Sequence, residues 1–193
     1  MNKPPAAKQS LVDYVHKTVR ARTKLAQLTK GSKVLEIGVG TGSSLEEDKK
    51  QFPQLRWFGT SWKEMAYRSY WKPNTKKRFV LAEGASLPFS AGSFNAIIVR
   101  GSVLVHIRKK REFLTEVYRV LKKGGRAAIH APIMDDGRDT ISEADGSFDK
   151  NTLANHREIK LIEQKHGELI DQRRRRLIVI KKTRVGLKFR DEA

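Results

Sequence analysis

The stretch VLEIGVGTG, from Val34 to Gly42, constrains the fold of this chain more than any other feature of its sequence. Its first four residues are apolar or branched except for the acid Glu36, as expected of a short buried strand. A glycine then occupies every second position, and glycine lets the backbone turn tightly and approach a ligand closely. Together with a helix predicted directly behind it at Ser43–Gln51, the stretch indicates a strand, a tight turn and a helix that hold a nucleotide-like ligand.

From these residues alone, the ligand can be a dinucleotide or another nucleotide-like cofactor. Ser43 stands where the dinucleotide fingerprint has Gly or Ala, which argues mildly against a dinucleotide. The predicted helix carries the acids Glu46, Glu47 and Asp48 in its first turns, where the helix dipole favours negative charge.

Short apolar strands and amphipathic helices alternate along most of the chain. We predict strands at Val34–Ile37, Arg56–Thr60, Arg78–Ala82, Ala96–Val99 and Arg126–His130, and helices at Ser43–Gln51, Lys63–Tyr70 and Arg108–Lys122. This order predicts an α/β fold, a Rossmann-like doubly wound and mostly parallel sheet with helices on both faces. Ligands of such sheets bind at the carboxyl ends of the strands.

The length of 193 residues favours one domain, which we place at residues 10–193 behind a flexible lead at 1–9. Within it we expect an amphipathic N-terminal helix at 10–30, a core at 34–132, an acidic loop or lid at 135–150 and terminal strands at 158–185. The terminal strands alternate in polarity, which predicts a C-terminal antiparallel hairpin or a three-stranded meander that turns at Gly167.

The chain is strongly basic, with 40 Lys and Arg against 21 Asp and Glu and a net charge of +19. Such a surplus favours a polyanionic partner, RNA or a ribonucleoprotein, over an enzyme that merely has a basic surface. The candidate phosphate-binding residues are Lys17, Arg20, Lys24, Arg173, Arg174, Arg175, Arg176, Lys181 and Lys182.

The composition also excludes several kinds of chemistry and location. There are no cysteines, which removes disulfides, thiolate metal sites and cysteine nucleophiles, and we expect no metal site. No apolar run approaches the roughly 18 residues of a membrane span, and the N-terminus lacks the apolar core of a secretory signal. We therefore expect a cytoplasmic protein with no membrane partner. An organellar matrix stays open as an alternative, and so does the oligomeric state.

Five segments follow one another in a set order: VLEIGVGTG, FGTSWKEM, LAEGASLPF, GSFNAIIVRGSVLVHI and EVYRVLKKGGRAAIH. This series resembles the class I S-adenosylmethionine-dependent methyltransferases and their type 11-like domain. The resemblance covers about Val34 to Pro132, and more weakly the terminal strands. It implies that residues 34–132 form a cofactor-binding core and that the cofactor is S-adenosyl-L-methionine.

The resemblance also implies roles for individual residues. The glycine loop wraps the methionine part of the cofactor, and the end of the third strand binds the adenine amino group. Ser61 stands where the family has an acid that holds both ribose hydroxyls, and Trp62 is placed to stack on adenine unless it is a structural tryptophan. The cofactor-binding candidates are Glu36, Gly38, Gly40, Thr41, Gly42, Ser61, Trp62, Glu83, Gly84, Ala85 and Arg100.

Methyl transfer from a sulfonium depends mainly on the alignment of donor and acceptor, and needs a base only if the acceptor must lose a proton. By the resemblance, acceptors bind at the loop after the fourth strand. The catalytic candidates are Arg100 to contact the cofactor or an acidic acceptor, Ser102 to position the acceptor, and His106 as a base. His130 is a second candidate base, and for both histidines a purely structural role is the alternative.

Three functions remain open at this point. The first is a methyltransferase that acts on RNA or a ribonucleoprotein, although the Asp/Asn-Pro-Pro-aromatic motif of amino-group methylases is absent after the fourth strand. The second is a methyltransferase-like protein with weak catalysis that binds RNA or a ribosomal particle, which the serine at position 61 favours. The third is a methyltransferase that acts on a small acidic metabolite.

Overall fold

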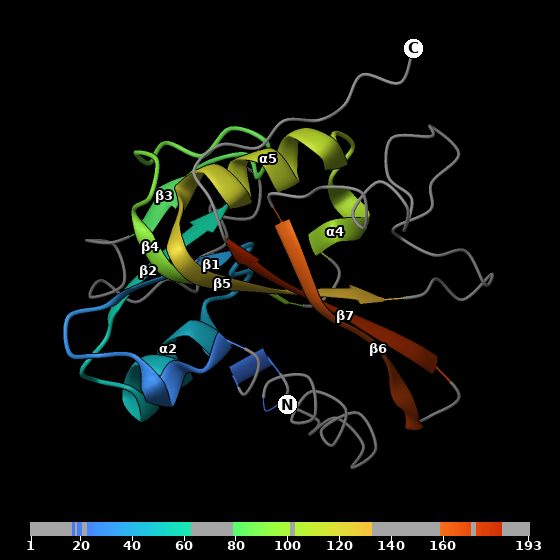
Figure 1. Ribbon diagram of the computed structural model, residues 1–193, viewed down its shortest axis with the longest axis horizontal. Coiled ribbons are helices and arrows are strands. Elements are labelled where there is room, and N and C mark those ends of the chain that lie inside the picture. The colour runs from blue at the N-terminus through green and yellow to red at the C-terminus, as the bar shows by residue number, and fades with distance from the viewer. Residues whose placement is uncertain are drawn as a thin grey trace.

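The computed structural model describes residues 17, 19–20, 23–62, 79–100, 103–132, 159–170 and 173–182. Within these residues, seven strands form one sheet in the order β3-β2-β1-β4-β5-β7-β6 (Figure 1). The strands are β1 (Lys33–Ile37), β2 (Arg56–Ser61), β3 (Phe79–Leu81), β4 (Phe94–Val99), β5 (Leu121–Pro132), β6 (Ile159–Ile170) and β7 (Arg173–Lys182). The pairings among β1 to β5 are parallel, whereas β7 pairs antiparallel with both β5 and β6. This confirms the predicted Rossmann-like, mostly parallel sheet with a C-terminal antiparallel hairpin.

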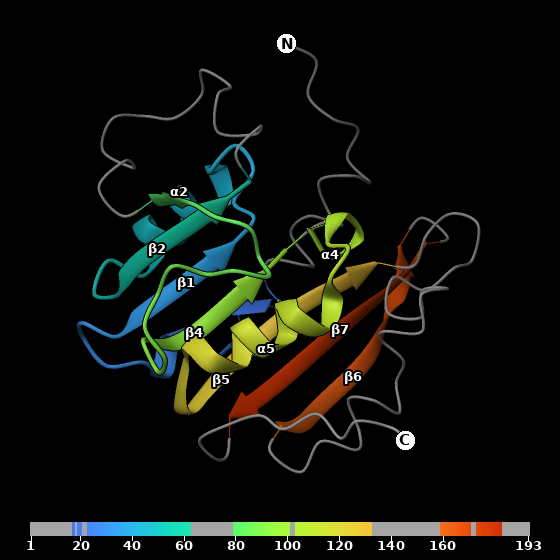
Figure 2. The ribbon, with the colours of Figure 1, turned by 90° about the horizontal axis from the view of Figure 1, so that it is seen from above.

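Helices cover both faces of the sheet. The described helices are the 3-10 helix η1 (Leu25–Gln27), α2 (Ser43–Gln51), α4 (Val103–His106) and α5 (Lys110–Val120). Figure 1 shows α4 and α5 on one side of the sheet and α2 on the other, and Figure 2 shows the strands side by side. The helix α2 has the predicted bounds. The predicted lead at 1–9, the helix at 63–70, the loop at 135–150 and a helix near 152–156 lie outside the described residues.

Side-chain alternation along the strands decides which residues face which helix layer. Leu35 and Ile97 belong to the core under α5, whereas Val34 and Ile98 belong to the core under α2. Successive side chains of a strand point to opposite faces. Glu36 lies two residues after Val34, and Arg100 lies two residues after Ile98. The alternation therefore directs an acidic and a basic side chain into the same buried layer.

The N-terminal helix ends earlier than predicted. The sequence indicated a helix at 10–30, but the described helical residues stop at Thr23 and Lys24 takes a left-handed conformation with φ of 53°. A left-handed residue cannot continue a right-handed helix. The 3-10 turn that follows buries Leu25 completely against the α2 side of the sheet, which compensates for the break.

Two further predictions are wrong, one at the end of α5 and one within β6. The helix predicted to run to Lys122 ends at Val120, because Leu121 already pairs with Phe94 as the first residue of β5. The turn predicted at Gly167 is wrong, since β6 continues through this residue, which pairs with Arg175. The ladder only shifts its register between Gly167 and Ile170. The terminal strands therefore form a two-stranded hairpin and not a three-stranded meander.

Candidate active site

The sheet register brings the predicted site residues to one edge. Ile37 lies beside both Thr60 and Val99, and Ser61 lies beside Leu81. The residues that follow these positions therefore lie together at the carboxyl ends of the four strands, where ligands of such sheets bind. Gly38 follows β1 and Trp62 follows β2. Glu83 follows β3 and Arg100 follows β4.

The glycine loop requires glycine for conformational and for steric reasons. Gly38, Gly40 and Gly42 have φ of 74°, 53° and 80°, values that other residues adopt only with strain. A Cβ at Gly38 would overlap the Cγ2 atom of Val103 on α4, whereas nothing lies within 4 Å of a Cβ at Gly40. The loop is thus packed against α4 at its beginning and open at its middle, where a ligand can approach the backbone.

Backbone hydrogen bonds tie this loop to its neighbours. The amides of Gly38 and Val39 both donate to the carbonyl of Thr60, at 2.9 and 3.0 Å, and the amide of Gly42 donates to Val39 at 2.8 Å. The loop conformation is therefore coupled to the end of β2, which carries the predicted ribose-binding position.

A buried charge network joins the strand before the loop to the helix after it, and it was not predicted. Arg100 Nη1 donates to Glu36 Oε1 at 2.9 Å, and Arg100 Nη2 donates to Asp48 Oδ2. Arg20 Nε donates to Asp48 Oδ1 at 2.6 Å. We call Glu36, Asp48, Arg100 and Arg20 the charge network. At its outer end, Arg20 Nη2 lies 3.1 Å from the exposed Glu47 carboxylate.

One sequence signal for this network was available. Glu36 and Arg100 have opposite charge and stand in apolar strands, at positions whose alternation directs them into the same layer. Buried charges in proteins are paired, so the two were candidates for each other. Asp48 and Arg20 carried no such signal, because a first-turn acid and a basic helix stripe are both common on surfaces.

Glu36 keeps one carboxylate oxygen available. Its side chain is 2% exposed, and among the described residues Oε2 has no hydrogen-bond partner. Burial raises the pKa of Glu36 to about 7, although the nearby Arg100 guanidinium acts in the opposite direction. A buried acceptor without a donor is costly, so this oxygen is suited to a ligand that brings a donor, above all a cationic one.

The segment that presents Glu83 is pinned to α5. Arg119 donates from Nη1 to Phe89 O at 2.7 Å and from Nη2 to Leu87 O at 2.8 Å, and Leu87 N donates to Glu116 Oε2 at 2.7 Å. The hydrogen bond from Arg119, more than any other contact, lowers the pKa of Glu116, so this carboxyl stays ionised. These bonds hold the backbone of Leu87–Phe89 on α5, four residues after the exposed Glu83.

The other candidates take different positions. Ser61 is buried as the last residue of β2, whereas Trp62 beside it is 50% exposed. His106 is exposed at the end of α4, and His130 is buried in β5. Ser102 lies outside the described residues. Neither Gly84 nor Ala85 is exposed fully, and Gly84 is held against the ring of Phe113, whose Cδ2 lies 2.9 Å from where a Cβ would stand.

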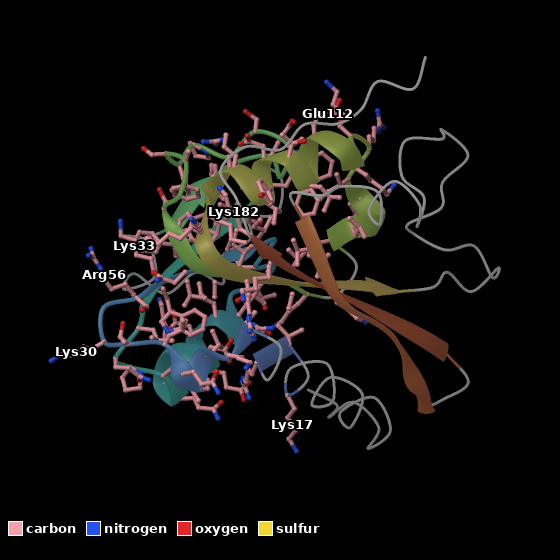
Figure 3. All side chains as sticks on the ribbon, viewed as in Figure 1. Lys17, Lys30, Lys33, Arg56, Glu112 and Lys182 are labelled. Carbon is pink, nitrogen blue, oxygen red and sulfur yellow. The ribbon has the colours of Figure 1, made fainter. Side chains whose placement is uncertain are left out.

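Only some of the residues predicted to form a basic surface are exposed. Figure 3 shows Lys17 extending outward and Lys182 between α5 and the sheet. Lys182 is buried and its Nζ donates to Tyr118 O at 2.8 Å, where burial lowers its pKa. Its placement in a phosphate-binding surface was therefore wrong, because a cation at a helix C-terminus satisfies the free carbonyls there. Arg20 is likewise engaged in the charge network, and the side chains of Arg173–Arg176 are not described.

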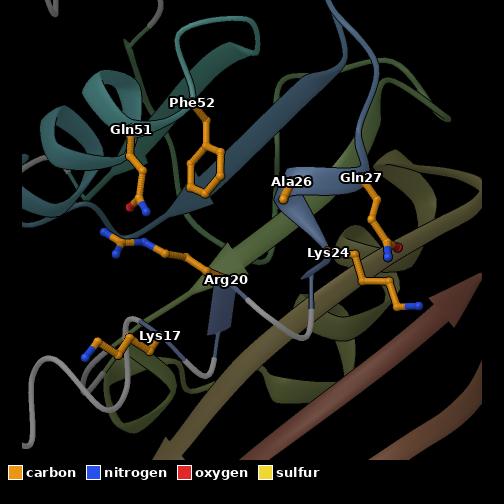
Figure 4. Close-up of a pocket in the computed structure, with 7 residues that line it drawn as sticks. All are labelled: Lys17, Arg20, Lys24, Ala26, Gln27, Gln51 and Phe52. Carbon is orange, nitrogen blue, oxygen red and sulfur yellow. The ribbon is translucent and has the colours of Figure 1, made fainter.

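A hollow remains where the first helix meets the end of α2. It has a volume of about 430 Å³ and is lined by Lys17, Arg20, Lys24, Ala26, Gln27, Gln51 and Phe52 (Figure 4). Lys17 and Lys24 are exposed, and the Arg20 side chain points toward Gln51, away from Lys24. In the part of the chain that the structure describes, no helix is long and apolar enough to cross a membrane.

The strand order and the glycine loop at the carboxyl edge define a Rossmann-like ligand-binding protein. A family model described as a methyltransferase domain matches residues 35–129. Among curated proteins, the O-methyltransferase rstn1 of Aspergillus nomiae is 31% identical over 113 residues, which are 56% of this chain and 50% of that protein. Over residues 35–129, the chain is thus similar to the class I S-adenosylmethionine-dependent methyltransferase family. It matches the curated relative over about half of that protein's length.

Solved structures share the fold at low sequence identity. The [4+2]-cyclase SpnF superposes with a TM-score of 0.70 at 16% identity, over 96% of this chain and 85% of that one. The geranyl diphosphate C-methyltransferase from Streptomyces coelicolor A3(2) has a TM-score of 0.65 at 13% identity, over 90% of this chain and 80% of that one. These likenesses concern the fold.

Proposed function

We propose that this protein is a methyltransferase that binds S-adenosylmethionine along the carboxyl edge of the sheet. The observation that carries the proposal is Glu36, whose buried Oε2 has no donor among the described residues and stands beside the open glycine loop. The methionine part of the cofactor carries an ammonium group, which supplies the missing donor. The neighbouring backbone over Gly40 leaves space for the ligand to lie against the loop.

The remaining edge residues fit the rest of the cofactor. Glu83 offers an exposed carboxylate that accepts a hydrogen bond from the adenine amino group, and Trp62 offers an exposed ring on which adenine stacks. Ser61 is buried and stands where the family has a carboxylate, so loss of a bidentate contact costs about 1–3 kcal/mol of binding free energy. We therefore propose a cofactor affinity that depends mainly on the glycine loop and Glu36.

In this mechanism, S-adenosylmethionine supplies the methyl group when it is bound. The protein contributes alignment: the loop and Glu36 fix the methionine end, and the pinned segment at Glu83 fixes the adenine end. His106 is exposed at the end of α4, next to the helix wall that contacts Gly38, and is the described residue best suited to accept a proton from an acceptor hydroxyl.

The cofactor proposal predicts a distinctive pH dependence. The ionised form of Glu36 attracts an ammonium group, so the affinity for S-adenosylhomocysteine, which carries the same group, should increase as the pH rises through about 7, the pKa of this carboxyl. Calorimetric titration between pH 5.5 and 8.5 measures this. Glu36→Gln should weaken binding about tenfold or more at pH 8 and remove the dependence, at a site where a charged hydrogen bond contributes roughly 1.5–3 kcal/mol.

The matched control is Glu47→Gln, which removes an exposed carboxylate from the same region. It should leave both the affinity and its pH dependence unchanged. Absence of binding by the wild-type protein at millimolar cofactor would contradict the proposed function, and an unchanged pH profile in Glu36→Gln would contradict the role of this residue.

For the methyl acceptor we propose RNA or an RNA–protein particle. The net charge of +19 and the hollow with its exposed Lys17 and Lys24 support this choice. The half-buried ring of Phe52 in the same hollow offers a stacking surface for a base. A small metabolite with a hydroxyl group is the alternative, supported by the name of the curated relative, an O-methyltransferase.

Binding of a single-stranded RNA oligonucleotide at several salt concentrations distinguishes the two. The affinity should fall steeply with salt, and the double variant Lys17→Glu/Lys24→Glu should bind about tenfold more weakly with a slope reduced by roughly 0.7 per lost phosphate contact. The control Lys30→Glu/Arg56→Glu makes the same charge change at exposed residues away from the hollow, and should bind within about threefold of the wild type. Negligible binding at low salt would remove RNA and leave the metabolite.

A further inference from the structure

One buried guanidinium spans both ends of the glycine loop. Glu36 precedes the loop at the end of β1, and Asp48 follows it inside α2. Arg100, at the end of the neighbouring strand β4, donates one nitrogen to each of them. All three side chains are almost completely buried, with exposed fractions of 2%, 0% and 6% in the order Glu36, Asp48 and Arg100. The strand that enters the loop and the helix that leaves it are thus joined through a third element.

We propose that Arg100 is a positioning residue: it holds Glu36 and α2 in a fixed relation, so that the glycine loop is formed and Glu36 Oε2 faces the ligand. This inference rests on the proposed function for its ligand. It changes the role first considered for Arg100, because a buried guanidinium with two carboxylate partners is not free to bind an acceptor. Arg100 acts through Glu36 and the loop, and not by contact with the reacting atoms.

The geometry requires arginine in particular. The planar guanidinium presents two terminal nitrogens that reach two carboxylates at once, whereas a lysine ammonium is a point charge that approaches one of them more closely than the other. When Glu36 is ionised, the network also balances its charge, because Glu36 and Asp48 oppose Arg100 and Arg20. Loss of Arg100 would leave two buried carboxylates with one guanidinium. Glu36 would then take up a proton, which removes the excess negative charge.

Arg20 extends the same device to the N-terminal helix. It donates to the second oxygen of Asp48, so that this carboxylate is held from both sides. Arg20 is also part of the wall of the basic hollow. The effect of Arg20 on the loop must pass through Asp48 and Arg100, and is therefore expected to be smaller than the effect of Arg100.

Hydrogen exchange and titration test this proposal without cofactor. In Arg100→Lys, the amides of Gly38, Val39 and Gly42, which hold the loop, should exchange at least about tenfold faster than in the wild type. The amide of Gly92, which donates to Arg119 O, should be unchanged and serves as the control. The groups that face Glu36 are Arg100 from β4, Asp48 from α2 and Arg20 from the N-terminal helix. Because Arg100 favours the ionised carboxylate and lysine would replace it poorly, the titration midpoint of Glu36, followed by carboxyl NMR, should move upward in Arg100→Lys.

Binding and kinetics test it with cofactor. Arg100→Lys should weaken the affinity for S-adenosylhomocysteine by about tenfold or more and raise KM for S-adenosylmethionine similarly, while kcat at saturating cofactor stays within about threefold. Arg20→Lys should show the same pattern with smaller changes, and it provides the test if Arg100→Lys does not fold. A purely stabilising role would instead lower the unfolding temperature with the affinity, the loop amides and the Glu36 midpoint unchanged.

The outcomes separate this inference from the proposed function. If the wild type binds no cofactor but Arg100→Lys releases the loop amides and shifts the Glu36 midpoint, the proposed function fails and the positioning role of Arg100 stands. If the wild type binds cofactor and a folded Arg100→Lys keeps its affinity, loop protection and Glu36 midpoint, the positioning role is overturned and the proposed function stands.

Discussion

We expect the Asp48→Ala variant to lose about 3–5 kcal/mol of its free energy of unfolding, the largest effect of any single substitution considered for this molecule. Asp48 is fully buried and receives both Arg100 and Arg20. Its removal leaves two guanidinium groups facing each other across the gap, and the desolvation cost of buried charge is then no longer compensated. Urea denaturation followed by circular dichroism measures the loss.

The neighbouring acid is the control for this prediction. Glu47 belongs to the same helix and also contacts Arg20, but its side chain is 61% exposed. Exposed ion pairs contribute little, so Glu47→Ala should change the free energy of unfolding by less than about 1 kcal/mol. Equal losses in the two variants would mean that the network contributes no more than a surface ion pair.

The Gly38→Ala variant should be destabilised by about 2–5 kcal/mol and should lose measurable cofactor binding. The residue would have to keep a left-handed conformation, at a cost of about 1–2 kcal/mol, and its methyl group would overlap Val103, at a cost of about 1–3 kcal/mol. Displacement of the loop would also disturb the open backbone at Gly40, against which we propose that the cofactor lies. Thermal unfolding and calorimetry with S-adenosylhomocysteine measure the two effects.

Two comparison variants divide the Gly38 effect into its parts. Gly40→Ala shares the positive φ but meets no atom within 4 Å, so only the conformational cost of about 1–2 kcal/mol should appear. In Gly38→Ala/Val103→Ala, most of the overlap is relieved because only the Cβ of residue 103, at 3.3 Å, stays close, and the double variant should be more stable than the sum of the single changes. If Gly40→Ala proves as unstable as Gly38→Ala, the contact with α4 is not what makes glycine necessary at position 38.

Much of the fold followed from local pattern. The bounds of α2 and the parallel order of β1 to β5 were predictable because apolar alternation and helical spacing are local properties. The left-handed conformation of Lys24 was not predictable, because lysine normally continues a helix. What stabilises the break is the burial of Leu25, which depends on tertiary packing. Gly167 failed for the opposite reason: its sequence indicates a turn, but pairing with β7 keeps it in the strand.

The candidate site divides in a similar way. The glycine loop and the edge residues follow from one contiguous stretch and from strand order. The charge network joins residues that are 28, 52 and 64 positions apart in the chain, so no local window contains it. Lys182 was assigned to the surface because lysine usually lies there. Its ammonium group instead donates from β7 to the carbonyl of Tyr118 near the C-terminus of α5. The acceptor is not determined by the fold, since a [4+2]-cyclase and a C-methyltransferase share it.

The charge network also has a consequence for how this sequence can vary over evolution. Each of its members compensates a buried charge of opposite sign, so a change at one of the four positions creates an uncompensated charge at another. Substitutions at positions 20, 36, 48 and 100 are therefore epistatic, and they should occur in charge-matched pairs. A relative with an apolar residue at the position of Arg100 is expected to have lost the acid at the position of Asp48 as well, and to anchor its glycine loop by packing.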